Sequence, residues 1–199
     1  MLGIMSLFNY LEEGGGNMYG NDDSDMKIVG AGEKKIDESD AEARLYRHER
    51  DNGNLEKAHA IGKTLAAALL ENGGMAYEKN VASDFDARNR SILFAFTADR
   101  VLDTFMPNHI IARSAQNEFF DEIRKNNIGL YESISRSGAF SMYLLCRRSG
   151  DGRYVGIGKT FADVIRRPDN EEIERRGEEL YSKYFDYCIE HIKNIEFSF

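Results

Sequence analysis

The sequence predicts an all-α protein, a bundle or orthogonal array of six to seven helices, with a short β-hairpin near residues 140–157 as a local alternative. Apolar residues recur at three- and four-residue spacing over most of the chain, which is the period of a helix that buries one face. The chain also contains only two prolines. So few prolines favour long uninterrupted helices over a β-sandwich that is rich in turns.

The chain is predicted to divide into a tail and a domain. Residues 1–37 are expected to form a flexible tail, because their glycines raise the entropic cost of ordering and their clustered aspartates repel one another. The apolar tip of this tail, Met1–Leu11, has no basic residue and therefore differs from a secretory signal. It either packs on the domain or docks on another molecule. Residues 38–199 are expected to form a single helical domain, since 42% of all residues are hydrophobic and 30% are charged.

The first two helices of the domain are predicted over Ser39–Arg50 and from Asn54 onward. Gly73 and Gly74 should end the second helix, as glycine commonly does just beyond a helix. The second helix has apolar or small residues at helical spacing, and these should form its buried face: Leu55, Ala58, Gly62, Leu65 and Leu69.

The third helix is predicted to begin at Ser83, with Asp86 completing a start that resembles a capping box. Its first half is apolar on nearly all sides, which indicates a central buried helix. Pro107 should end it, and Asn108 is placed to cap a fourth helix. The fourth helix repeats an apolar residue every four positions, which predicts its buried face: Ile111, Ala115, Phe119 and Ile123.

A fifth helix is predicted over Leu130–Arg148, and Phe140–Ile157 allows two interpretations. The turn residues Gly150–Gly152 at its centre fit a β-hairpin. A helix–loop–helix is the preferred interpretation, because a helical stripe continues from upstream. That stripe is formed by residues at three- and four-residue spacing: Ile134, Gly138, Met142 and Leu145.

The last helix is predicted to follow Pro168, with Asp169 as its cap and Glu172 at the third helical position. This arrangement satisfies free amides at the helix start and places negative charge at the positive end of the helix dipole. One face of the helix should be buried, and it is formed by these residues: Ile173, Gly177, Leu180, Tyr184, Tyr187, Cys188, His191 and Ile195.

A short sequence occurs twice, as Ile61–Ala66 and as Ile157–Ala162, through chance or through an old helical duplication. The second copy invites a nucleotide-binding interpretation, since Gly158, Lys159 and Thr160 match the end of a P-loop. However, Arg153 stands where a P-loop needs its first glycine, and no buried parallel strand is predicted before it. The sequence therefore predicts no P-loop, although the segment could bind an anion at a helix N-terminus.

Metal, cofactor and covalent chemistry find little support in the sequence. Glu56 and His59 share one helical face, but a di-metal site needs a second such pair, and none is present. Cys146 and Cys188 are far apart, form no CxxC pattern and are expected to be free thiols in a reducing cytosol. We therefore expect neither a metal nor a cofactor, and the sequence identifies no nucleophile.

Charge is unevenly distributed along the chain. Residues 87–168 carry 13 lysines and arginines against 8 acidic side chains, whereas residues 1–86 carry 9 against 17 and residues 169–199 carry 4 against 9. The basic middle either pairs with the acidic flanks, within one chain or between two copies, or binds an anionic small molecule. The second alternative uses the residues near the central glycine loop: Arg147, Arg148, Arg153, Gly158, Lys159 and Thr160.

These patterns predict a non-enzymatic helical interaction or regulatory protein that self-associates, with a partner that the sequence does not identify. Double-stranded DNA is not expected as a partner, because the net charge is −8. A cytoplasmic location without membrane insertion is expected, since no targeting signal or spanning segment is visible. The alternative is a helical domain or enzyme that binds an anionic small molecule through residues 147–160.

Overall fold

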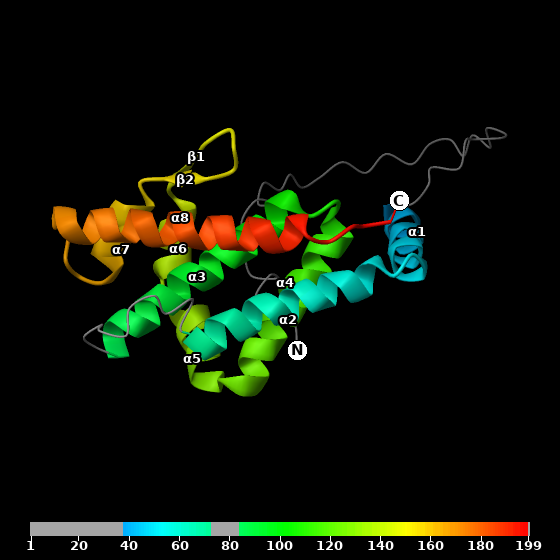
Figure 1. Cartoon of the computed structure of the whole chain (residues 1–199), viewed down its shortest axis with the longest axis horizontal. Coiled ribbons are helices and arrows are strands. Elements are labelled where there is room, and N and C mark those ends of the chain that lie inside the picture. The colour runs from blue at the N-terminus through cyan, green and yellow to red at the C-terminus, as the bar shows by residue number, and fades with distance from the viewer. Residues whose placement is uncertain (1–37, 73–83, 199) are drawn as a thin grey trace, which may run out of the picture. The chain divides into compact units, whose positions relative to one another are not determined.

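Figure 1 shows the chain as a computed structural model, which describes residues 38–72 and 84–198. These residues form eight α-helices and one antiparallel pair of strands, which confirms the predicted all-α class with a short hairpin. Residues Glu42–Phe199 form a compact unit. The elements are α1 (Glu38–Asp51), α2 (Asn54–Asn72), α3 (Asp84–Phe105), α4 (His109–Asn126), α5 (Ile128–Arg136), α6 (Ala139–Leu144), β1 (Arg147–Arg148), β2 (Tyr154–Val155), α7 (Ile157–Val164) and α8 (Glu171–Lys193).

Three sequence predictions fall outside the described residues: the tail 1–37 with its apolar tip, the end of α2 at Gly73 and Gly74, and the start of α3 at Ser83. None of the helices described here is both long enough and apolar enough to cross a membrane.

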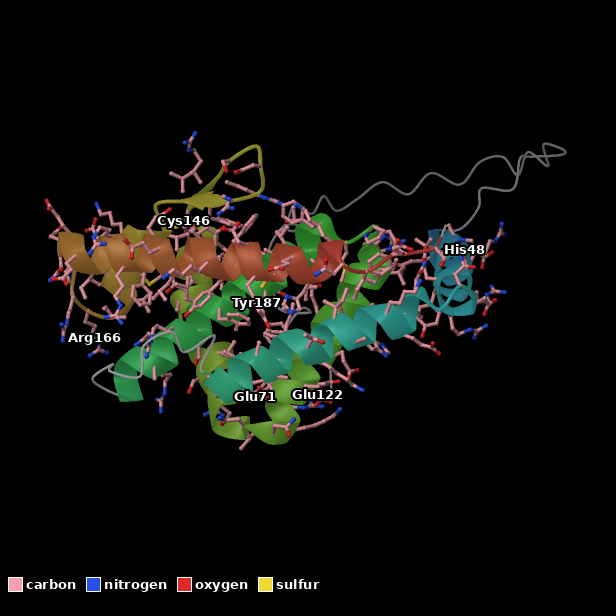
Figure 2. All side chains as sticks on the ribbon, in the orientation of Figure 1. His48, Glu71, Glu122, Cys146, Arg166 and Tyr187 are labelled. Carbon is pink, nitrogen blue, oxygen red and sulfur yellow. The ribbon has the colours of Figure 1, made fainter. Side chains whose placement is uncertain are left out.

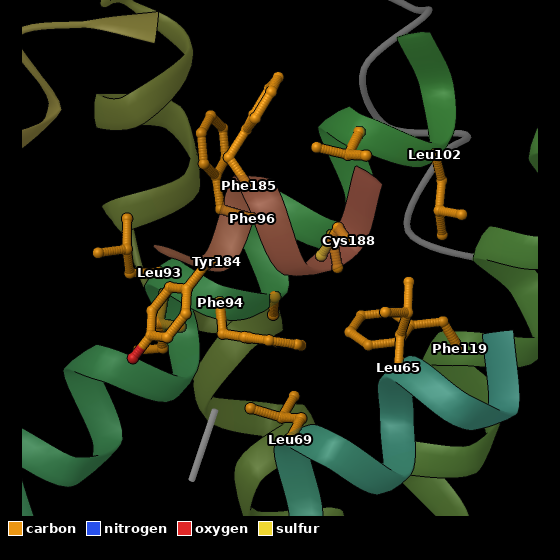
Figure 3. Close-up of a cluster of buried hydrophobic side chains, with 14 of the residues drawn as sticks. Leu65, Leu69, Leu93, Phe94, Phe96, Leu102, Phe119, Tyr184, Phe185 and Cys188 are labelled. Atoms are coloured by element: carbon orange, nitrogen blue, oxygen red, sulfur yellow. The ribbon is translucent and has the colours of Figure 1, made fainter. Parts of the chain in front are cut away.

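Helix α3 is the central helix of the described unit, because it packs against both α4 and α8. All residues from Ser91 to Asp99 are buried, as the apolar character of this segment predicts. The polar member Thr97 donates its hydroxyl to the carbonyl oxygen of Leu93 at 2.8 Å, so its burial leaves no unsatisfied donor. Figure 3 shows side chains of α2, α3, α4 and α8 meeting in the resulting core.

Helix α4 follows its sequence prediction closely. The side chain of Asn108 accepts the amides of Ile110 and Ile111 at 3.0 and 3.1 Å, which confirms it as the N-cap. The residues that recur every four positions are all buried, as predicted: Ile111, Ala115, Phe119 and Ile123.

The segment 130–148 differs from its prediction, because one expected helix is two helices followed by a hairpin. Helix α5 ends at Arg136, and α6 begins at Ala139 after an extended Ser137. This break changes the phase of the buried face, so α6 buries Ala139 and Tyr143. Met142 and Leu145, predicted to be on the buried stripe, are exposed instead. The break also explains why the described part has one helix more than the largest predicted number.

The repeated sequence Ile-Gly-Lys-Thr has the same packing role in both copies. A Cβ on Gly62 of α2 would collide with the carbonyl oxygen of Ala115 and the amide nitrogen of Phe119 on α4. A Cβ on Gly158 of α7 would likewise collide with the carbonyl oxygen of Glu174 and the amide nitrogen of Glu178 on α8.

In each copy the glycine therefore lies over one turn of the partner helix. Because glycine has no side chain, the two helix backbones can come close. The partners differ in chain order, because α8 directly follows α7 whereas α3 separates α2 from α4. A simple duplication would have kept that order, so the repeat reflects one packing solution that is used twice.

Helix α8 begins one residue later than predicted. Asn170, rather than Asp169, is the N-cap, and its side chain accepts the amide of Ile173 at 3.1 Å. The two residues have equally suitable side chains, so the sequence alone does not discriminate between them. Three members of the predicted stripe are fully buried, and the stripe extends to neighbouring positions; the buried residues are Gly177, Tyr181, Tyr184, Phe185, Cys188 and Ile192.

Helix α7 ends in a Schellman motif with an unusual residue at its centre. The amide of Arg167 donates to the carbonyl of Ala162 at 2.9 Å, and the amide of Arg166 donates to that of Asp163 at 3.0 Å. Arg166 has a φ of 60°, a left-handed conformation in which this motif usually has glycine.

We therefore expect Arg166→Gly to raise the free energy of unfolding by about 1 kcal/mol, because glycine adopts this conformation without a Cβ penalty. The matched control is Arg175→Gly on the exposed face of α8, which should lower the same quantity by about 1 kcal/mol. Urea denaturation of both variants measures the difference. Destabilisation by both changes would show that the side chain of Arg166 stabilises the turn.

A buried carboxylate joins four parts of the unit. Glu49 of α1 accepts the side-chain amides of Asn54 and Asn108 at 2.6 and 2.9 Å. Asn54 also exchanges hydrogen bonds with the backbone of Ser198 at 2.7 and 2.9 Å. These bonds tie the end of α1 to the starts of α2 and α4 and to the C-terminal segment, and they satisfy polar groups whose isolation would be costly.

Candidate functional site

The hairpin between α6 and α7 carries most of the residues that the sequence analysis singled out. Arg147 lies opposite Val155 and Arg148 lies opposite Tyr154 in an antiparallel pair. Asp151 organises the turn, because it accepts hydrogen bonds from the Ser149 hydroxyl and from the backbone amide of Arg153. These two bonds hold the pKa of the Asp151 carboxyl below its usual value.

Arg153 fastens the hairpin to α8. Its guanidinium forms an ion pair with Asp186, donates to the hydroxyl of Ser182 at 3.2 Å and lies 4.2 Å from the centre of the Phe185 ring. The amide of Tyr154 also donates to α8, through the hydroxyl of Tyr181 at 2.8 Å. Arg153 therefore has a complete set of partners within its own chain.

Arg148 and Thr160 also have internal partners, and these lie on different elements. The guanidinium of Arg148 donates to the hydroxyl of Thr104 on α3. The hydroxyl of Thr160 lies 3.1 Å from the sulfur of Cys146 and 3.3 Å from the carbonyl oxygen of Gly156. These contacts hold the hairpin and the start of α7 in place, and they do not direct the two side chains toward one ligand.

Gly158 already has an anion at its amide. Its N–H donates to a carboxylate oxygen of Glu178 at 2.9 Å, so α8 supplies the negative charge that the start of α7 attracts. The glycine also lies directly against the α8 backbone, which explains its presence without a phosphate. Of the six predicted ligand-binding residues, Arg148, Arg153, Gly158 and Thr160 thus each have partners within the chain.

Arg147 and Lys159, the other two predicted residues, are exposed, and no polar partner is found for them among the described residues. Arg147 is surrounded in sequence and register by large apolar side chains that also face solvent. Leu145 is 87% exposed, and Val155, directly opposite Arg147, is 46% exposed. We call this set the hairpin surface, and it consists of Met142, Leu145, Arg147 and Val155.

Sequence reasoning missed the apolar part of the hairpin surface, because it assigned Met142 and Leu145 to a buried stripe. A signal was present in the pairing of two adjacent leucines, Leu144 and Leu145, since a single narrow helical stripe cannot bury both equally. Figure 2 places Cys146, which follows them, beside the hairpin.

Other ionisable groups that could carry chemistry are engaged in structural contacts. Asp99 is buried, accepts from Arg100 at 2.8 Å and accepts from the Gln116 amide at 2.9 Å. Burial raises the pKa of Asp99, and the neighbouring Arg100 opposes that rise. Burial likewise raises the pKa of the Cys188 thiol, which makes it a poor nucleophile.

A metal site around Glu56 and His59 has no further ligands in the described part of the chain. Both side chains are exposed on α2, and residues 38–72 and 84–198 contain no group of three or more side chains placed to hold a metal ion.

Comparison of the chain with protein-family models, with curated proteins and with solved structures gives no match.

Proposed function

We propose that this chain is a non-enzymatic helical interaction protein that self-associates through the hairpin surface. The observation that carries the proposal is the exposure of two large apolar side chains in and next to the hairpin, Leu145 at 87% and Val155 at 46%. Clustered apolar side chains of this kind are typical of surfaces that another protein covers. A second copy of the chain is the proposed occupant.

The charge distribution supports a second copy. Among the described residues, Arg113 of the middle segment pairs with Glu42 of an acidic flank and Arg153 pairs with Asp186 of the other, and His109 also lies 3.4 Å from Glu42. Most other pairs of the middle segment are local to one helix, such as Arg124 with Asp121. The positive charge at the hairpin surface is therefore available for an acidic partner, and the acidic flanks of another copy have the required charge.

We also propose that the chain works in the cytoplasm. A reducing environment suits its two free cysteines, Cys146 and Cys188.

The replacement Leu145→Ser tests the proposed surface. The full chain should show an average mass that rises with concentration in sedimentation equilibrium, and Leu145→Ser should weaken this association by about tenfold, because it removes an apolar anchor. High salt should weaken it further, since charge pairs at a rim are screened. The matched control is Ile128→Ser on α5, an aliphatic side chain with 58% exposure that is not part of the hairpin surface.

Figure 1 shows α5 and the hairpin at opposite edges of the view, so the control should leave association unchanged. A monomeric mass at every concentration would refute self-association. Equal weakening by Leu145→Ser and Ile128→Ser would refute the assignment to this surface. Thermal denaturation should give the same midpoint for both variants, because both positions are exposed.

A further inference from the structure

The segment that follows α8 is bound by the start of α2, mainly through its backbone. The side-chain amide of Asn54 donates to the carbonyl oxygen of Ser198 at 2.7 Å and accepts the backbone N–H of the same residue at 2.9 Å. Three residues later on α2, Lys57 donates to the carbonyl oxygen of Glu196 at 2.6 Å and to the hydroxyl of Ser198 at 3.3 Å. Figure 1 shows this segment beyond the end of α8. We call residues 195–198 the strap, and Asn54 and Lys57 the strap site.

The strap has the pattern of an extended peptide. Ile195 and Phe197 are half-buried and pack against the core, whereas Glu196 and Ser198 are exposed. This alternation is that of a strand, in which successive side chains face opposite ways. The backbone groups of residues two apart share one edge of a strand, and those of Glu196 and Ser198 both bind α2. The strap is therefore held as bound peptides often are, by backbone hydrogen bonds and by alternate apolar side chains.

The strap site is arranged by residues that do not touch the strap. Asn54 is completely buried, and its side-chain N–H also donates to Glu49 at 2.6 Å. Because a carboxylate accepts hydrogen bonds, this bond sets the direction of the Asn54 amide. One N–H and the carbonyl oxygen of that amide then face the strap, a pair that matches the C=O and N–H of one extended residue. Glu49 is held in turn by Asn108, the cap of α4, so the site is preorganised without the strap.

The contacts of the strap are the same whichever copy of the chain supplies it. Exchange of the strap between two copies therefore replaces each hydrogen bond by an identical one, which is a low-cost route to a dimer. An empty site is less favourable, because Ile195 and Phe197 then lose their apolar contacts. A single turn at Asn194 joins the strap to α8, so only this turn has to change when the strap leaves.

We propose that the strap site is a peptide-binding site through which two copies of the chain exchange straps. It binds the strap of its own chain in this structure, and it binds the strap of a second copy in the exchanged dimer. The ligand it accepts is an extended segment with apolar residues at alternate positions, as in Ile195–Ser198. This interface is additional to the hairpin surface and does not depend on association there.

Binding of a fluorescent peptide with the sequence of residues 194–199 to the full chain tests the site. The chain's own strap competes with the peptide, so a variant with a weakened strap should bind it more tightly. Phe197→Ser removes an apolar anchor of the strap and should tighten peptide binding by about tenfold, measured by fluorescence anisotropy. The matched control is Glu196→Ser, whose side chain is exposed, and it should bind the peptide like the wild type. Damage to the fold would weaken binding, whereas release of the strap tightens it.

A change in the site should have the opposite effect. Lys57→Met, combined with Phe197→Ser, should weaken peptide binding by about tenfold, because it removes a charged donor to the strap. Lys63→Met is the control, since Lys63 lies on the same helix but pairs with Glu118 on α4. Failure of Phe197→Ser to bind the peptide saturably would overturn the proposal, and so would equal affinity of this variant and the wild type. Equal weakening by the two lysine changes would also overturn it, because it would indicate general charge attraction.

A mixture of two full-length variants tests the exchange itself. Both carry Leu145→Ser, so the result does not depend on the hairpin surface. One also carries Phe197→Ser and retains a working site, and the other carries Lys57→Met and retains a working strap. Sedimentation equilibrium should show a dimer in the mixture at concentrations where each variant alone is monomeric. A monomeric mass in the mixture would overturn strap exchange, whether or not the wild-type chain associates through the hairpin surface.

Discussion

Replacing Phe96 with alanine is expected to lower the free energy of unfolding by about 4 kcal/mol, because it creates a cavity where the surroundings cannot collapse. Phe96 lies on the central helix α3 and is completely buried. Its ring centre is 5.6, 5.1 and 5.3 Å from those of Phe140, Tyr143 and Tyr154. Figure 3 shows Phe96 within the buried cluster. Equilibrium urea denaturation, followed by circular dichroism, measures the loss.

The same replacement at Phe105 is the matched control. Phe105 lies at the end of the same helix, is 37% exposed and has one aromatic neighbour in the described residues, Phe185 at 5.7 Å. Its change to alanine should cost about half as much or less, since a partly exposed site leaves a smaller cavity. Equal losses at both positions would mean that the cluster around Phe96 is not the main core. Because Tyr154 belongs to β2, the loss at Phe96 should also loosen the hairpin.

Replacing Gly158 with alanine should lower the free energy of unfolding by about 2 kcal/mol. The added Cβ would collide with the backbone of α8 at Glu174 and Glu178, and backbone cannot move aside as a flexible side chain can. Such overpacking costs about 1–3 kcal/mol or more, and the better helix propensity of alanine returns about 1 kcal/mol of it. The melting temperature should fall by about 4–8 °C for a domain of this size.

The control for this change is Gly138→Ala. Gly138 has an ordinary φ of −66°, and nothing lies within 4 Å of a Cβ built there. Alanine should therefore leave stability unchanged or raise it slightly, by restricting the unfolded chain. Gly62→Ala should behave like Gly158→Ala, because its Cβ would meet the α4 backbone. A Gly158→Ala variant as stable as Gly138→Ala would contradict the close helix crossing.

The elements that the sequence predicted well are those in which local periodicity and tertiary packing agree. Helix α4 is an example, since Asn108 caps it and Phe119 is fully buried on the predicted face. The central position of α3 was also predictable, because only a helix enclosed on nearly all sides can be apolar nearly all round.

The errors arise where a single residue shifts the helical phase. The break at Ser137 and Gly138 turns Met142 and Leu145 outward, and the spacing of the predicted stripe does not reveal where the helix breaks. The start of α8 shifts by one residue because Asp169 and Asn170 are both good caps. Periodicity fixes the type of an element more firmly than its ends.

Most of the candidate site could be recognised only from the tertiary structure. The residues that hold Arg153 and Gly158 are Asp186 and Glu178 of α8, which lie 33 and 20 residues later in the chain, and no local pattern connects them. A small pocket lined by Arg90, Arg167 and Arg176 is formed by α3, the α7–α8 turn and α8, so its parts are separate in sequence. An excess of arginine in the middle of the chain was visible, but not which of these side chains would face one another.

Two helix pairs pack closely at a glycine, α2 with α4 at Gly62 and α7 with α8 at Gly158, and they differ in how easily they can form during folding. Gly158 meets the helix that follows directly in the chain, so the α7–α8 pair can form with a small loss of loop entropy. Gly62 packs on α4, and the whole of α3 lies between α2 and α4 in the sequence. This contact therefore closes a longer segment of chain and should form more slowly. We therefore expect the α7–α8 pair to form earlier in folding than the packing of α2 on α4.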